Sequence, residues 1–448
     1  MVGKSGRIDL PHGGSNSTMT LRWSRGAVAV FFFINGAVLA SWVPHIPAIK
    51  SRHMLTDGAL GLVLLSMAVG SVLALPAAGW LVGRFGSRVM TAAAGIGLCL
   101  ALPLPVVSPS VALLSLSLAI LGACNGLLDV SMNAQAAEVE RRVGRSIMSS
   151  FHALFSLGGF AGALVAGRAM ASGRADAAHV GIATVVALSA VALAWPGLVS
   201  TPVVDDPAGP VVARPSGTLV ALGILALLGL MAEGAMADWS AVYLHDVLGS
   251  SSAVAAVGFA AFSLAMAAGR LSGDALVRQL GPQRVLRGSS AVAALGLGLA
   301  LLVGRPAIGI VGCALVGVGI ANIIPILFGA AARVPGVPPG RALAAVASTG
   351  YLGFLAGPPL IGVVAEAAGL ATGLGLVSAA CAIIALKASA LPVAAFRTCA
   401  APRAVRPTEM RSPHEPYRAG CPKPWSDPRD EVHATPAPRE YVRPPSRP

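Results

Sequence analysis

Two carboxylic acids, Asp129 and Glu233, fall inside long apolar segments of this 448-residue chain. If these segments are helices, Asp129 lies about 12 Å and Glu233 about 22 Å from the helix ends that adjoin basic residues, at about 1.5 Å per residue. An ionised carboxylate at that depth in hydrocarbon is costly, so an acid there is a candidate for reversible protonation. We therefore predict both acids as proton-coupling residues.

The acid in the first half belongs to a polar helix face. Asn125, Asp129 and Asn133 recur every four residues, so their side chains share one side of a helix. His152 lies about 10 Å from the same end of the next predicted helix, within reach of Asp129. An imidazole titrates near neutral pH, which makes His152 a third predicted proton-coupling residue. The alternative is a structural hydrogen bond that joins the two helices.

Other polar side chains in the apolar segments are predicted substrate contacts. Asp238 can serve as a gate or as an interfacial cap, and Trp239 can stack on a sugar ring or belong to an interfacial aromatic belt. Asn322 precedes Pro325, a pattern that predicts a broken helix with freed carbonyl groups along a cavity, or else packing between helices. The predicted substrate-binding residues are Asn35, Asn125, Asp238, Trp239 and Asn322.

One pair of opposite charges is expected to be structural. Arg270 and Asp274 are four residues apart near one end of a predicted helix, the spacing of an ion pair within a helix. We assign both residues to gating or helix stabilisation rather than to substrate binding.

These residues must be positioned by helices in a bilayer. Hydrophobic residues make up 55% of the chain and charged residues 11%, and the mean hydropathy is +0.76, which excludes a soluble domain of this size. Charge-free stretches reach the roughly 20 residues that a helix needs to cross hydrocarbon. The longest, 89–128, is expected to split into two helices at Pro103, Pro105 and Pro109. Similar reasoning predicts twelve spans, six in each half.

The two halves of the sequence repeat each other at an offset of 195 residues. The matched positions are segments 156–162 and 351–357, Gly86 and Gly281, and Gly122 and Gly317. Duplicated membrane halves related by an axis along the membrane normal are the architecture of alternating-access carriers. The predicted fold class is an all-α integral membrane protein with twelve transmembrane helices in two pseudo-symmetric six-helix halves.

The basic residues predict an orientation with both termini in the cytoplasm, because one set of short loops carries eleven of them and the other set five. The formal net charge of +13 is then a topology signal and not a nucleic-acid footprint. We expect a monomer in the inner membrane whose partners are protons, lipid and a small solute. The predicted inner residues are Arg84, Arg88, Arg141, Arg142, Arg145, Arg214, Arg278, Arg284, Arg287, Arg333 and Arg341; the predicted outer residues are Lys50, Arg52, Arg168, Arg174 and Arg305.

The predicted organisation has five parts. They are a cytoplasmic segment 1–25, a six-helix half 26–200, a Pro-rich cytoplasmic linker 201–217, a second six-helix half 218–396, and a Pro/Arg-rich tail 397–448 expected to be disordered. The six cysteines show no metal-ligand spacing, and no cofactor motif or nucleotide-binding loop is present. A membrane enzyme would need a clustered nucleophile and base, so we expect no enzyme.

A Gly/Arg-rich stretch joins the second and third predicted spans. Gly79, Arg84, Gly86 and Arg88 resemble the signature loop of the major facilitator superfamily, with Gly83 where that family has an acid. The resemblance implies transport by alternating access and assigns these four residues to gating or loop structure.

A closer likeness concerns segments 122–133 and 151–158, which resemble the fourth and fifth helices of the fucose-permease-like branch. In that branch the acid in the fourth helix takes part in proton-coupled sugar uptake, which implies this role for Asp129. The expected function is proton-coupled transport of a small polar solute, with a proton-antiport drug or metabolite exporter of the same fold as the alternative.

Overall fold

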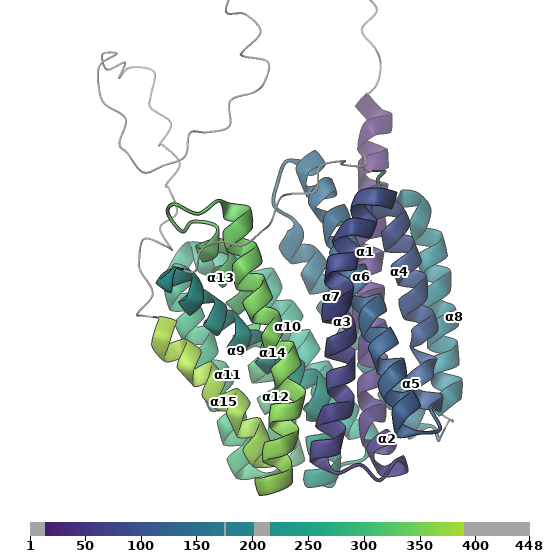
Figure 1. Ribbon diagram of the computed structural model, residues 1–448, viewed down its shortest axis with the longest axis vertical. Coiled ribbons are helices and arrows are strands. Elements are labelled where there is room, and N and C mark those ends of the chain that lie inside the picture. Colours follow the sequence, from purple (N-terminus) through teal and green to yellow (C-terminus); the bar gives the residue numbers. More distant parts are fainter. Residues whose placement is uncertain (1–13, 174–175, 201–215, 389–448) are drawn as a thin grey trace, which may run out of the picture. The chain divides into compact units, whose positions relative to one another are not determined.

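The computed structural model describes residues 14–173, 176–200 and 216–388, with side chains from Leu21 onward (Figure 1). Twelve helical segments among these residues are long and apolar enough to cross a membrane, which confirms the predicted fold class. The predicted tail 397–448 and most of the predicted linker lie outside the described residues. The helix α1 (Gly14–Trp42) already begins within the predicted N-terminal segment 1–25.

The first half contains six spans, some of them built from two or three helical pieces. They are α1 with η1 (Val43–His45) and α2 (Ile46–Arg52), α3 (Asp57–Phe85), α4 (Ser87–Ala101) with α5 (Pro103–Val107), α6 (Val111–Val143), α7 (Met148–Ala171), and α8 (Asp176–Ala194) with η2 (Trp195–Gly197).

The second half contains the other six spans. They are α9 (Gly217–Val242) with the π-helical turn η3 (Tyr243–Val247), α10 (Ser252–Leu280), α11 (Pro282–Val303), α12 (Pro306–Ile320) with α13 (Ile323–Ala331), α14 (Pro339–Ala368), and α15 (Leu370–Lys387).

The long apolar stretch 89–128 is divided as predicted, but the turn is shorter than the proline cluster. Pro103 opens α5, which continues the span of α4, and the chain reverses at Ser108–Ser110. The hydroxyl of Ser108 donates to the carbonyl of Leu104 at 2.7 Å, and Ser110 caps α6 by accepting from the amide of Leu113 at 3.3 Å. These serines provide the hydrogen bonds that a chain reversal requires.

The sequence repeat is also a repeat of local structure. Gly86 between α3 and α4 has φ 80°, and Gly281 between α10 and α11 has φ 83°, a backbone conformation that favours glycine. A methyl group on Gly122 would overlap the carbonyl of Met67, and one on Gly317 would overlap the carbonyl of Phe262. Met67 and Phe262 are themselves 195 residues apart, so the same helix contact recurs in each half.

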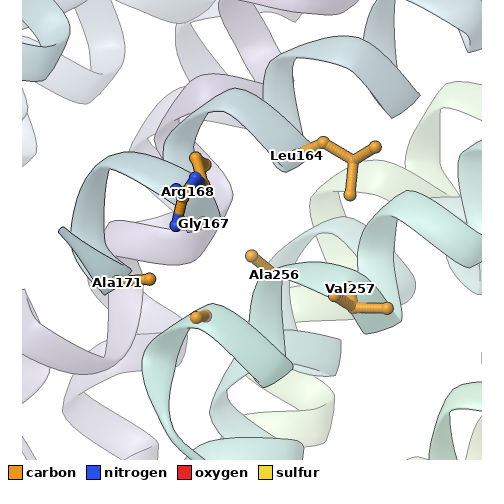
Figure 2. Close-up of a pocket in the computed structure, with 7 residues that line it drawn as sticks. Leu164, Gly167, Arg168, Ala171, Ala256 and Val257 are labelled. Carbon is orange, nitrogen blue, oxygen red and sulfur yellow. The ribbon is translucent and has the colours of Figure 1, made fainter.

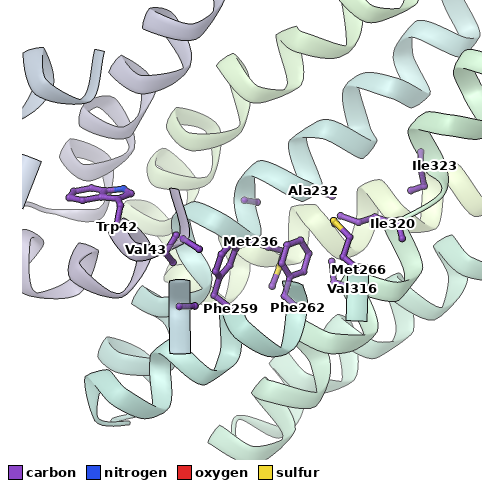
Figure 3. Packing of buried hydrophobic residues seen from close by; sticks show 14 of the residues in the cluster. Trp42, Val43, Ala232, Met236, Phe259, Phe262, Met266, Val316, Ile320 and Ile323 are labelled. Atoms are coloured by element: carbon purple, nitrogen blue, oxygen red, sulfur yellow. The ribbon is translucent and has the colours of Figure 1, made fainter. Parts of the chain in front are cut away.

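The two halves meet along two seams, α3 against α14 and α7 against α10. A methyl group on Gly61 would lie 2.6 Å from the carbonyl oxygen of Pro358, so the backbones of α3 and α14 are in close contact. Such small-residue contacts are how helices associate in lipid, where dispersion rather than water exclusion drives packing. In Figure 3, Val43 of the first half lies beside Phe259 of α10, which continues this contact between the halves.

Candidate functional site

The central charged pair joins α9 and α10. Arg270 Nη2 lies 3.1 Å from Glu233 Oε1, and the exposed fractions of the two side chains are 13% and 23%. The expected ion pair between Arg270 and Asp274 is not formed: within the described part of the chain, the exposed Asp274 carboxylate makes no ion pair. An acid facing water gains little from pairing, whereas the half-buried Glu233 needs a cation.

The guanidinium of Arg270 also reaches across the seam to α7. It donates to Ser156 Oγ at 2.7 Å and to the backbone carbonyl of His152 at 3.2 Å. Arg270 therefore bridges the two halves, with the carboxylate on its own side and two neutral acceptors on the other.

The second acid is held by a separate bridge. Asn133 donates to Asp129 Oδ1 at 3.0 Å, which confirms that the two side chains share one face of α6. The hydroxyl of Tyr351, on α14 in the other half, donates to Asp129 Oδ2 at 3.4 Å. Asp129 is thus bonded directly to the other half, whereas Glu233 is connected to it only through Arg270.

His152 does not meet Asp129 by a hydrogen bond. Its half-buried imidazole packs edge-on against Phe32 of α1, with the ring centroids 5.3 Å apart. The expected common depth of about 10–12 Å is wrong: at about 1.5 Å per residue, Asp129 lies about 21 Å from the end of α6, whereas His152 lies about 6 Å from the start of α7. The rotation of α7 also turns the ring toward α1. The backbone carbonyl of His152, rather than its side chain, contacts the charged pair.

The predicted asparagine contacts fall into two groups. Asn35 is 1% exposed on α1, and its Nδ2 lies 3.8 Å from the sulfur of Met132 while its Oδ1 has no partner among the described residues. Asn125 is half-buried on α6, on the same face as Asp129. Asn322 lies at the predicted helix break between α12 and α13, and its amide donates to the carbonyl of Gly269 at 3.0 Å. That bond supports the packing interpretation for Asn322.

Asp238 and Trp239 have different surroundings although they are adjacent. Asp238 is half-buried and makes no hydrogen bond or ion pair within the described residues. Trp239 is fully buried, at 0% exposure, with its indole N–H unpaired among those residues. The position of Trp239 in the core rules out an interfacial aromatic belt.

The Gly/Arg stretch is mostly helix rather than loop. Gly79 lies within α3, which continues to Phe85, so Gly86 alone forms the turn. The guanidinium of Arg84 lies 5.6 Å from the centre of the Trp80 ring, a cation–π contact. Arg88 donates to Ser200 Oγ at 3.2 Å and so connects α4 to the end of the first half.

A charge network that the sequence analysis missed lies at the opposite end of the halves from Arg84. Lys50 Nζ is 2.6 Å from Asp57 Oδ1 and 2.9 Å from Asp246 Oδ2, so it joins the first half to η3 in the second. Nearby, the amide of Gly58 donates to Glu366 Oε2 at 3.1 Å. Lys50 was counted only as a loop charge, and sequence spacing cannot reveal partners 196 residues away.

Tyr351 is a second site residue that the sequence analysis did not single out, although its position in the sequence repeat pointed to it. It stands 195 residues after Ser156, so the two begin the matched glycine-rich segments.

Among the described residues, no group of three or more His, Cys, Asp or Glu side chains can hold a metal ion.

Two six-helix halves, connected by charged and hydroxyl groups at mid-span, define a membrane carrier. The sequence pattern of the Major Facilitator Superfamily matches residues 27–338. The chain therefore belongs to the Major Facilitator Superfamily, whose members are transporters and not enzymes.

Individual relatives agree with this assignment. An uncharacterized MFS-type transporter of Yersinia pestis is 39% identical over 347 residues, which cover 78% of this chain and 90% of that protein. Membrane protein MosC of Rhizobium meliloti is 35% identical over 376 residues, covering 84% and 92% of the two chains. A bacterial homologue of the human lysosomal transporter Spinster, solved in an inward-facing and occupied conformation, has the same fold, with TM-score 0.67 and 14% identity over 87% of this chain and 100% of that one.

Proposed function

We propose that this transporter couples the movement of protons to that of a small polar solute, with Asp129 and Glu233 as the proton-carrying groups. The observation that carries the proposal is their placement: Asp129 accepts a hydrogen bond from Tyr351 of the other half, and Glu233 pairs with Arg270, which itself bonds to Ser156 of the other half. Alternating access requires the halves to change their mutual contacts, and a proton that changes such a contact is coupled to that change.

The bridge at Arg270 gives this coupling a physical form. Ionised Glu233 holds the guanidinium on α9, while Ser156 and the His152 carbonyl hold it on α7. Protonation of Glu233 removes the charge that orients Arg270 and weakens the pair. An arginine is always charged, so it then remains as an unpaired cation that either stays with its neutral acceptors or binds an incoming group.

Protonation of Asp129, in the first half, would change its contact with Tyr351 of the second half. The ionised carboxylate accepts hydrogen bonds from both Asn133 and Tyr351, and these are charge-assisted. A protonated Asp129 accepts less strongly and loosens the contact between α6 and α14. Asp129 and Glu233 therefore control different bridges, one through α14 and the other through α7.

We propose the inward-facing state for this conformation. The ion network of Lys50, Asp57 and Asp246 closes one end of the path, and the positive-inside bias assigns that end to the outside. In this orientation both termini and the linker 201–217 are cytoplasmic. The membrane is proposed to be the inner membrane and the protein a monomer.

The solute is proposed to be a sugar or related metabolite. The support is the resemblance of segments 122–133 and 151–158 to the fucose-permease-like branch, together with hydrogen-bonding groups at mid-span. Asn125 and Asp238 are half-buried polar side chains without partners among the described residues, which makes them the leading solute contacts.

The experiment uses purified protein in proteoliposomes that contain a pH-sensitive dye. Solutes are first selected by thermal-shift screening of sugars, sugar acids, amino acids and common drugs, because a ligand stabilises the state that it binds. Adding a selected solute should then change the internal pH in wild-type vesicles and leave it unchanged with Glu233→Gln. Solute flux without any pH change in the wild type would refute proton coupling. Asp274→Asn is the matched control, because it neutralises an exposed carboxylate without an ion-pair partner among the described residues.

A further inference from the structure

A shallow pocket lies on the seam between α7 and α10, away from the central site. Its volume is about 230 Å³. Figure 2 shows side chains of α7 on one side and of α10 on the other. The lining residues are Leu164, Gly167, Arg168 and Ala171 of α7 and Ala253, Ala256 and Val257 of α10.

The pocket is apolar, and its shape follows from small residues. A methyl group on Gly167 would lie 2.7 Å from the Cβ of Ala256, so the two helices touch at the floor. Above the floor, Leu164 and Val257 are 37% and 39% exposed and form the walls of an open groove. In a bilayer, an open apolar groove between two spanning helices is filled by an acyl chain, because water there would lack hydrogen-bond partners.

Arg168 is the single charged residue among those that line the groove. Its side chain is exposed and makes no ion pair or hydrogen bond with any other described residue. The helix α7 ends at Ala171, so Arg168 stands one turn from the end of its span, the depth of lipid headgroups. A guanidinium binds a phosphate through two parallel hydrogen bonds.

From these observations we infer that the groove between α7 and α10 is a binding site for an anionic phospholipid. The acyl chain lies between Leu164 and Val257, and Arg168 binds the headgroup phosphate. A neutral zwitterionic lipid fills the same groove but gains less from the cation, so the site selects headgroup charge.

Native mass spectrometry on delipidated protein in detergent tests this site. The probes are phosphatidylglycerol and phosphatidylcholine with identical acyl chains, each titrated separately. Arg168→Gln should lower the affinity for the first phosphatidylglycerol about fivefold, the effect expected of one basic residue near an anionic lipid surface, and should lower the affinity for phosphatidylcholine clearly less. Arg305→Gln, the same change at another exposed arginine, should bind both lipids as the wild type does.

A second variant tests the contribution of the groove to lipid binding separately from that of the charge. Ala171→Trp fills the groove from an exposed position and should weaken binding of both lipids at this site. The proposal is overturned if Arg168→Gln and the wild type bind phosphatidylglycerol equally, or if Arg305→Gln loses as much affinity. It is also overturned if Ala171→Trp retains wild-type binding, because the headgroup would then sit on Arg168 without an occupied groove.

Discussion

Ser156 on α7 and Tyr351 on α14 occupy equivalent positions of the repeat, and each contacts a charged side chain from the other half. Ser156 Oγ accepts a hydrogen bond from Arg270 at 2.7 Å, and the Tyr351 hydroxyl donates one to Asp129 at 3.4 Å. The duplication therefore places one hydroxyl at each seam, and the two have diverged to bind opposite charges. Tyr351 thus contacts an acid directly, whereas Ser156 contacts the cation that pairs with Glu233.

Replacing Asp129 by asparagine should abolish solute accumulation driven by a pH gradient while leaving solute exchange partly intact. The amide keeps the shape of the side chain and a hydrogen bond with Asn133 but cannot carry a proton. Accumulation and exchange of a solute found by thermal shift are measured in the same proteoliposome preparation. Asp274→Asn serves as the control, and full accumulation by the Asp129 variant would remove this acid from the mechanism.

Tyr351→Phe should reduce gradient-driven accumulation by acting through Asp129. The lost hydrogen bond to a carboxylate is worth roughly 0.5–1.5 kcal/mol, because its 3.4 Å length is at the weak end of the range. In a double-mutant cycle, Tyr351→Phe should add nothing to Asp129→Asn. Losses that simply add would show that the hydroxyl works independently of the acid.

Arg270→Gln should destabilise the protein more than the same change combined with Glu233→Gln. Removing only the arginine leaves a half-buried carboxylate unpaired, at a cost of roughly 1–3 kcal/mol once the partial exposure of the pair is considered. The apparent melting temperature in detergent is the measurement. A double variant no more stable than Arg270→Gln would contradict the ion pair.

Lys50→Met should open the end of the path that this lysine closes. Without the ammonium group, Asp57 and Asp246 repel each other across the two halves. A cysteine at Val43, which is 3% exposed, should then react several-fold faster with a membrane-impermeant maleimide added from outside, in a background lacking the native cysteines. Lys387→Met, at an exposed position on α15, is the control, and equal labelling in all three proteins would exclude a gate at Lys50.

The proposed orientation has its own test. Met54 is 89% exposed in the turn between α2 and α3, and Arg145 is exposed in the turn between α6 and α7, at opposite ends of the spans. In intact cells an impermeant thiol reagent should label Met54→Cys at once and Arg145→Cys only after permeabilisation. The reverse pattern would invert the proposed topology.

Much of the architecture follows from the sequence because its causes are local. The length of an apolar run decides whether a helix can span hydrocarbon, and the positive φ of the turns at Gly86 and Gly281 favours glycine at both positions. The bond between Asp129 and Asn133 was predictable in the same way, since residues four apart on a helix always face each other. The helix break before Pro325 was predictable too, because proline has no amide hydrogen to donate to a helical hydrogen bond.

Only the tertiary structure decided which helices the charged side chains contact. Spacing suggested Asp274 as the partner of Arg270 and Asp129 as the neighbour of His152, whereas packing supplied Glu233 and Phe32. The physical reason is that sequence sets the position of a residue along its own helix, but the rotation of one helix against another depends on small-residue contacts summed over the whole seam. Lys50 illustrates this best, because its partner Asp246 is brought to it only by the docking of one half on the other.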